Sequence, residues 1–147
     1  MRVLFLCTGN SCRSQMAEGW SRALHDGRIA AFSAGIAPHG LDPRAVRVMA
    51  EAGVDISEQR SQHVSEILEL HEIEPLDWVV TVCDHARESC PVFPGQAKVI
   101  HRGFPDPPAL AEGLGEEDAL EQYRKVRDQI RSFVQDLPSV LATPENP

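Results

Sequence analysis

Short apolar runs alternate with segments of helical periodicity along this chain, and this alternation constrains the fold more than any other feature. Runs of strand length lie at residues 3–6, 29–34, 78–82 and 98–100. The first run is followed, after a polar loop, by apolar residues at helical spacing. Strands that alternate with helices are typical of a parallel sheet with helices on both faces. We therefore predict an α/β fold.

Capping signals and periodicity set the predicted helix boundaries. Asp42 followed by Pro43 predicts a helix start, with Asp as the N-cap and Pro at the first helical position. Ser14 is the predicted N-cap of the first helix. Eight apolar residues at a period of 3.6 predict the last helix over residues 116–137. Residues 103–115 are rich in Pro and Gly and are predicted to form a loop.

Length, charge and hydropathy narrow the class of protein. The 147 residues fit a single domain, which we place at residues 1–141, with a flexible tail at residues 142–147. A net charge of −8 argues against nucleic acid as a partner, because neutralising phosphates needs many cations. No run approaches the ~20 apolar residues of a membrane span, and residues 3–6 are too short for a signal peptide. We expect a cytoplasmic monomer with no membrane partner.

Four cysteines, Cys7, Cys12, Cys83 and Cys90, are the next chemical signal. In the cytoplasm they are expected to stay reduced, so a catalytic or metal-binding role is favoured over structural disulfides. Neither Cys7 with Cys12 nor Cys83 with Cys90 has the Cys-x2-Cys spacing of zinc sites, which disfavours zinc.

The loop of residues 7–14 has a cysteine, five residues and then Arg-Ser, between a predicted strand and helix. Backbone N–H groups that run into a helix N-terminus form a nest for a tetrahedral oxyanion. Arg13 adds a planar fork that can hold two of its oxygens. This positive field is expected to lower the pKa of Cys7, giving a thiolate set for in-line attack on the central atom. The predicted anion-binding residues are Thr8, Gly9, Asn10, Ser11, Cys12, Arg13 and Ser14. A merely buried Cys7 at a strand end is the alternative.

Residues 7–19 resemble the active-site segment of arsenate reductases built on the low-molecular-weight protein tyrosine phosphatase fold. They read Cys-Thr-Gly-Asn-Ser-Cys-Arg-Ser-Gln-Met-Ala-Glu-Gly. The similarity continues in the same order at residues 33–35, 79–83, 90–91, 103–107 and 123–128. The resemblance covers nearly the whole chain and implies a four-stranded parallel sheet flanked by helices.

Phosphatases share this scaffold and are the main alternative function. They usually have Pro where this chain has Gln15, and an aromatic residue after a later Asp-Pro, where this chain has Pro108. A phosphatase also needs only one cysteine. This chain has Cys83 and Cys90 at the spacing of the thioredoxin-coupled reductases, which favours the reductase.

The resemblance implies a reaction cycle for these residues. Cys7 attacks arsenate, and Asp106 protonates the departing oxygen as general acid. Cys83 attacks Cys7, which releases arsenite and leaves a disulfide, and Cys90 then attacks Cys83 and frees Cys7. Thioredoxin reduces the resulting disulfide by thiol–disulfide exchange. Glutaredoxin with a small thiol is the alternative donor, and a metalloid-binding protein without turnover is a further alternative. The alternatives to these catalytic roles are structural: Asp106 would start a turn before Pro107, and Cys90 would be a thiol with no part in the reaction.

A disulfide between Cys83 and Cys90 constrains the local backbone. In a regular helix, seven steps of about 1.5 Å would separate their Cα atoms by about 10 Å. A disulfide needs them within ~7 Å. We therefore expect residues 84–95 to be a loop or an unwound helix and the mobile part of the protein.

Some members of the family bind potassium behind the loop, and Asn10, Glu18 and Ser33 match that pattern. Gln62 stands where an Asp would be expected, so this chain departs from the pattern at one ligand. We expect no tightly bound cofactor, with potassium as a possible addition.

Overall fold

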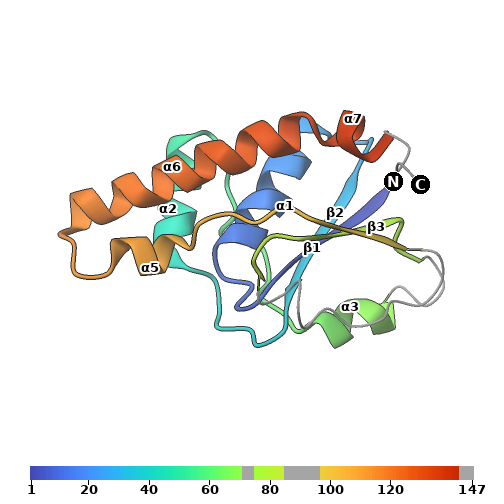
Figure 1. The fold of residues 1–147 in the computed structure, drawn as a ribbon, viewed down its shortest axis with the longest axis horizontal. Helices are drawn as coiled ribbons and strands as arrows, with labels where there is room; N and C mark the ends of the chain where they lie inside the picture. Colours follow the sequence, from blue (N-terminus) through green and yellow to red (C-terminus); the bar gives the residue numbers. More distant parts are fainter. Residues whose placement is uncertain (71–74, 85–96, 143–147) are drawn as a thin grey trace.

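Four parallel strands form one sheet at the centre of the molecule (Figure 1). The computed structural model describes residues 1–70, 75–84 and 97–142. The strand order is β2-β1-β3-β4, with β1 at Arg2–Cys7, β2 at Ala30–Gly35, β3 at Trp78–Thr81 and β4 at Lys98–His101. The predicted four-stranded parallel sheet is confirmed.

Helices cover both faces of this sheet, as predicted. Figure 1 shows α3 on one side and α1, α2, α6 and α7 on the other. Their bounds are Arg13–Leu24 for α1, Pro43–Glu51 for α2, Val64–Leu70 for α3, Pro107–Ala111 for α5, Glu116–Gln135 for α6 and Leu137–Ala142 for α7. Asp42 caps α2 as predicted, because its side chain accepts a hydrogen bond from the Arg44 N–H at 2.9 Å.

The core forms where α1 and α6 pack on the sheet. The β1 side chains from Val3 to Leu6 are fully buried, as expected for a central strand covered on both faces. The predicted stripe of α6 is also buried, including Tyr123 and Ile130. The indole of Trp20 on α1 donates a hydrogen bond to the Arg127 carbonyl of α6 at 3.2 Å, which ties the two helices together.

Two local predictions are wrong. The first helix begins at Arg13, with Cys12 rather than Ser14 at its N-cap. The Cys12 carbonyl accepts the first helical hydrogen bond from Met16 at 2.9 Å, while the Ser14 hydroxyl accepts a hydrogen bond from the Asn10 side chain. Residues 103–115 are not all loop, because Pro107 opens the short helix α5.

The predictions for the C-terminal tail and for the mobile segment concern residues that lie mostly outside the described part of the chain. Ala142, placed in the predicted tail, is the last residue of α7, and residues 143–147 lie outside the described part of the chain. Most of the predicted mobile segment, residues 85–95, lies outside it as well. Among the described residues, no helix is both long enough and apolar enough to cross a membrane.

Candidate active site

Two cysteines meet at the carboxyl edge of the sheet, where β1 and β3 end side by side. Cys7 is the last residue of β1, and Cys83 follows β3 by two residues. The two strands pair in parallel with Leu6 opposite Thr81, and the Val82 N–H donates to the Leu6 carbonyl at 3.0 Å. The chain leaves β1 toward β2 on one side, with β3 on the other. A crevice at such a switch point is the usual ligand site of open α/β sheets.

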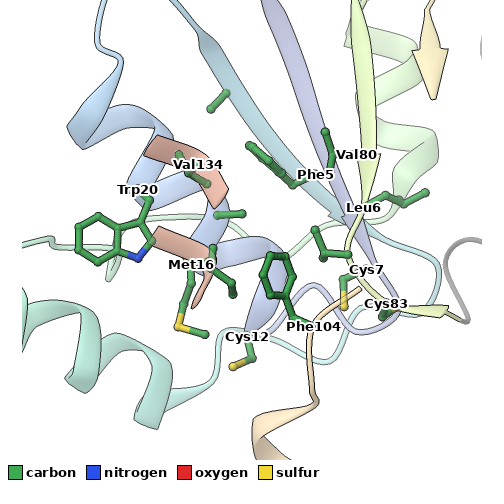
Figure 2. Close-up of a cluster of buried hydrophobic side chains, with 14 of the residues drawn as sticks. Phe5, Leu6, Cys7, Cys12, Met16, Trp20, Val80, Cys83, Phe104 and Val134 are labelled. Atoms are coloured by element: carbon green, nitrogen blue, oxygen red, sulfur yellow. The ribbon is translucent and has the colours of Figure 1, made fainter. Parts of the chain in front are cut away.

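Figure 2 shows the Cys7 and Cys83 side chains next to each other below these strand ends. Both are buried cysteines that form no disulfide among the described residues, and the Cys83 sulfur also lies 3.2 Å from the Thr8 hydroxyl. The hydrogen bond with Cys83 is the largest cause that raises the pKa of Cys7, and burial raises it further. Arg13 and the Thr8 N–H oppose this rise and lower the pKa of Cys7 by less.

The prediction that the loop by itself holds Cys7 as a thiolate is therefore wrong for this arrangement. Two adjacent sulfurs cannot both carry a charge in a buried site, so the neighbouring Cys83 makes the Cys7 thiol harder to ionise. The positive field of the loop is present, but the neighbouring thiol outweighs it.

The loop of residues 7–14, here called the anion loop, turns at Asn10 in the left-handed region, with φ of 44°. The Asn10 side chain is fully buried and holds both ends of the turn. Its amide nitrogen donates to the Ser14 hydroxyl at 2.8 Å, and its oxygen accepts from the Gln62 N–H at 2.9 Å. A loop with a residue in the left-handed region can direct consecutive backbone N–H groups toward an anion.

Gln15 is a second buried brace of the anion loop. Its amide donates to the Asn10 carbonyl at 2.9 Å and to the Arg60 carbonyl at 3.1 Å. Gln59 in turn donates to the side-chain oxygen of Gln15 at 2.9 Å. The sequence marked Gln15 only as a departure from the phosphatases; its bracing role depends on residues far along the chain and could not be seen there.

Gly35, at the end of β2, allows the anion loop to lie against the sheet. A Cβ at this position would come within 2.6 Å of the Thr8 carbonyl oxygen and 3.0 Å of the Asn10 nitrogen. Any side chain here would therefore displace the loop.

Arg13 opens α1 and lies mostly buried beside the pocket. Its guanidinium donates to the Phe104 carbonyl at 3.0 Å and lies 3.6 Å from the Asp106 carboxylate. The Asp106 side chain is 47% exposed and makes no capping hydrogen bond to α5. Asp106 therefore faces the anion site rather than serving its own helix, which is the placement that a general acid requires.

A pocket of about 700 Å³ lies over the thiols. Its walls beyond the anion loop come from His39, Asp84, Asp106 and Pro108. Among the described residues, no Phe, Tyr or Trp lines it. Pro108, which stands where the phosphatases usually have an aromatic residue, is one of the lining residues.

Glu18, a buried carboxylate behind the loop, tests the expected potassium site. Its Oε1 accepts from the Ser33 hydroxyl at 2.8 Å, and its Oε2 pairs with the Arg22 guanidinium at 2.9 Å. Gln62 donates from its side chain to the Ser33 carbonyl at 3.1 Å and from its backbone to the Asn10 side-chain oxygen at 2.9 Å. Protein donors thus already bind the oxygens that a cation would need. Potassium binding at this position stays a prediction from the resemblance.

The structure brings most of the predicted site residues together. Cys7, Thr8, Gly9, Ser11, Cys12, Arg13, Cys83 and Asp106 all line the pocket. Asn10 and Ser14 do not line it but brace the loop from behind, because their side chains bond each other. Cys12 is buried, and burial raises its pKa, so it is held as a neutral thiol. Cys90 lies outside the described residues.

An anion cradle with a thiol at its base and a second thiol in contact defines a class of enzyme. That class binds a tetrahedral oxyanion and attacks its central atom with a cysteine. The chain belongs to the family described as low molecular weight phosphotyrosine protein phosphatase, whose sequence pattern matches residues 2–144.

Relatives within this family differ in activity. An arsenate reductase of Halalkalibacterium halodurans is 48% identical over 128 residues, which cover 87% of this chain and 88% of the relative. A solved arsenate reductase in the phosphate binding state is 31% identical, with a TM-score of 0.70 over 96% of this chain and 98% of that chain. A low molecular weight protein tyrosine phosphatase from T. tengcongensis is also 31% identical, with a TM-score of 0.72 over 95% and 99%.

Proposed function

We propose that this chain reduces arsenate to arsenite through Cys7, with Cys83 and Cys90 as a disulfide relay that thioredoxin re-reduces. Curated relatives of this chain that are arsenate reductases support the reductase class. The relay and its electron donor are the part proposed here. The contact between the Cys7 and Cys83 thiols in the oxyanion pocket is the observation that carries it, because a phosphatase has no use for a second thiol there.

The first step is capture and attack of the oxyanion. The anion loop and Arg13 hold arsenate over Cys7, and the doubly charged anion can accept the proton that the thiol pair retains. The Cys7 sulfur then forms a bond to arsenic as one arsenic–oxygen bond breaks. Asp106, which faces the pocket beside Arg13, supplies the proton that lets this oxygen leave as water.

The second step moves two electrons to arsenic. The Cys83 sulfur attacks the Cys7 sulfur, so a sulfur–sulfur bond forms and the sulfur–arsenic bond breaks. The electron pair of that bond stays on arsenic, which leaves as arsenite in the As(III) state and takes up the proton that Cys83 releases. Each sulfur has lost one electron, and the enzyme holds a Cys7–Cys83 disulfide.

The third step regenerates Cys7. The Cys90 thiolate attacks the Cys83 sulfur, which frees Cys7 and moves the disulfide to Cys83 and Cys90. A dithiol donor of the thioredoxin type then reduces that disulfide by exchange. The role of Cys90 is supported by its spacing from Cys83 in the sequence and by the resemblance to the family. The cytoplasmic location and the monomeric state likewise stay predictions.

A phosphatase remains the second candidate because the solved phosphatase overlays this chain as well as the solved reductase does. The anion cradle serves both substrates, since arsenate and phosphate are nearly isosteric. Activity on a phosphate ester would therefore not separate the two functions. Dependence of the activity on Cys83 and Cys90 would separate the reductase from the phosphatase.

The test is NADPH consumption with arsenate, thioredoxin and thioredoxin reductase, for the unmodified protein and for Cys90→Ser. We expect arsenate-dependent turnover that Cys90→Ser abolishes, and no effect of Val140→Ser, a change at an exposed residue of α7. Phosphate-ester hydrolysis that needs only Cys7, with no arsenate turnover, would overturn the proposal in favour of a phosphatase. Turnover only with glutaredoxin and glutathione would overturn the proposed donor.

A further inference from the structure

A histidine on β4 bridges the residues on either side of Cys83. His101 is the last residue of β4, opposite Thr81 at the end of β3. Its Nδ1 lies 2.8 Å from the Thr81 hydroxyl oxygen, and its Nε2 lies 3.0 Å from an Asp84 carboxylate oxygen. Because a carboxylate only accepts, Nε2 is the donor in that hydrogen bond. One imidazole therefore ties residues 81 and 84 across Cys83.

The backbone next to this bridge supports the same placement. A Cβ on Gly103 would lie 3.2 Å from the His101 Nε2 and 3.4 Å from the Asp84 carboxylate oxygen. The imidazole and the carboxylate therefore pack directly on the glycine backbone. A larger residue at this position would push the hydrogen-bonded pair apart.

Backbone hydrogen bonds hold the chain as far as Val82. The Val82 N–H donates to Leu6 at 3.0 Å, and the Val82 carbonyl accepts from Phe104 at 3.1 Å. One residue after Cys83, the Asp84 side chain is 87% exposed, and its hydrogen bond to His101 ties it back to the sheet. Cys83 thus stands between a residue fixed by the sheet and a residue fixed by the imidazole.

We propose that His101 is a positioning residue that, by binding Asp84, holds the Cys83 sulfur against Cys7 for the disulfide-forming step. This inference rests on the proposed attack of Cys83 on Cys7. His101 does not line the pocket and touches no reacting atom, so it acts only through Asp84 and the backbone around Cys83. Anion binding, which depends on the anion loop and Arg13, does not require it.

The experiment isolates one disulfide bond. In a Cys90→Ser background the reaction stops after Cys83 attacks Cys7, with one arsenite released for each enzyme. We would mix this enzyme with arsenate, quench with acid, alkylate the free thiols and follow the Cys7–Cys83 disulfide by mass spectrometry. Inorganic phosphate binding, measured by calorimetry on the same proteins, reports the anion site independently.

His101→Ala in this background is expected to slow disulfide formation about tenfold, since losing one hydrogen bond that orders a reacting group costs about one such factor. His101→Gln, which keeps an N–H donor, should recover part of the rate. The dissociation constant for phosphate should stay within about twofold. Lys98→Ala, at the other end of the same strand, is the matched control and should change neither value.

Asp84 supplies a sharper pair of variants. Asp84→Asn and Asp84→Ala both remove the charge from the pocket wall, but only Asn keeps an acceptor for the His101 Nε2–H. We expect Asn to preserve the rate of disulfide formation and Ala to reduce it by the same factor as His101→Ala. Equal rates for the two Asp84 variants, or a normal rate for His101→Ala, would overturn the positioning role. Absence of any Cys7–Cys83 disulfide in the Cys90→Ser parent would instead overturn the proposed function.

Discussion

The anion loop and the Cys83 side of the pocket are built in different ways. In the anion loop, Asn10 and Ser14 are fully buried and bond each other, and the buried Gln15 that follows the loop bonds the Asn10 carbonyl. On the Cys83 side, the Asp84 side chain is 87% exposed and bonds His101, and the Asp106 side chain is 47% exposed and pairs with Arg13. The side chains that brace the anion loop are therefore buried and make several hydrogen bonds, whereas the two carboxylates on the Cys83 side are partly in contact with solvent.

This difference agrees with the roles proposed for the two parts of the pocket, which are anion binding by the anion loop and disulfide exchange at Cys83. An oxyanion is bound best by donors that are already in place, because no energy is then needed to arrange them. A sulfur that must bond first to one partner and then to another has to change its position between steps. Among the described residues that flank Cys83, Asp84 is tied to the sheet by the His101 hydrogen bond, which a step of the proposed relay can break and remake.

The largest expected effect comes from removing the nucleophile of the anion loop. Cys7→Ser should lower arsenate turnover by at least about a thousandfold, because a hydroxyl is a far weaker nucleophile than a thiolate. Phosphate binding should survive, since the loop and Arg13 remain. Coupled NADPH consumption and calorimetry with phosphate measure the two halves separately. Substantial turnover in the variant would show that another cysteine is the nucleophile.

Arg13→Lys tests whether the guanidinium fork, rather than charge alone, holds the anion. Lys keeps the charge but cannot bind two oxygens or reach Phe104 in the same geometry, so KM for arsenate should rise about 10- to 100-fold. Steady-state kinetics give KM and kcat for this variant and for Arg47→Lys, an exposed control on α2. An unchanged KM would mean that the loop amides bind the anion without Arg13.

Gln15→Leu should weaken the anion loop without touching the pocket. The change leaves the Asn10 and Arg60 carbonyls without this donor and removes one of the two acceptors of the Gln59 amide, at a cost of about 2–4 kcal/mol in the free energy of unfolding. Urea denaturation followed by circular dichroism gives this value. Gln129→Leu, exposed on α6, is the control and should shift stability by less than about 0.5 kcal/mol.

Cys83→Ala should lower the pKa of Cys7. Cys83 is the largest cause that raises this pKa, so its removal leaves burial opposed by Arg13 and the Thr8 N–H. The midpoint of Cys7 alkylation by iodoacetamide should therefore move to lower pH, as followed by mass spectrometry of the peptide that contains Cys7. A midpoint that stays in place or moves to higher pH would contradict the thiol–thiol contact.

The smallest effect is expected for potassium. Because Arg22 and Gln62 already bind the oxygens around Glu18, replacing potassium by sodium should change neither turnover nor melting temperature. Arg22→Ala removes the cation that balances this buried carboxylate, so stability in this variant should become sensitive to the added cation. A clear potassium requirement in the unmodified protein would show that the ion displaces Arg22.

The sequence by itself determined the parallel sheet, the Cys-x5-Arg loop and the family. These follow from local patterns: short apolar runs, helical stripes, and a loop whose residues are consecutive. The helix start at Arg13 and the helix α5 were missed, because Ser14 bonds Asn10 rather than the helix end and Pro107 begins a helix within a loop-like composition.

Only the tertiary structure decided which residues act on one another across the chain. It placed Cys83 against Cys7, as the resemblance implied, but this contact reversed the expected direction of the Cys7 pKa, and Arg22 and Gln62 bond the oxygens where a cation was expected. It also joined His101 to Asp84 across two strand ends. The physical reason is that pKa values and hydrogen-bond partners depend on neighbours in space, and local sequence patterns do not report those neighbours.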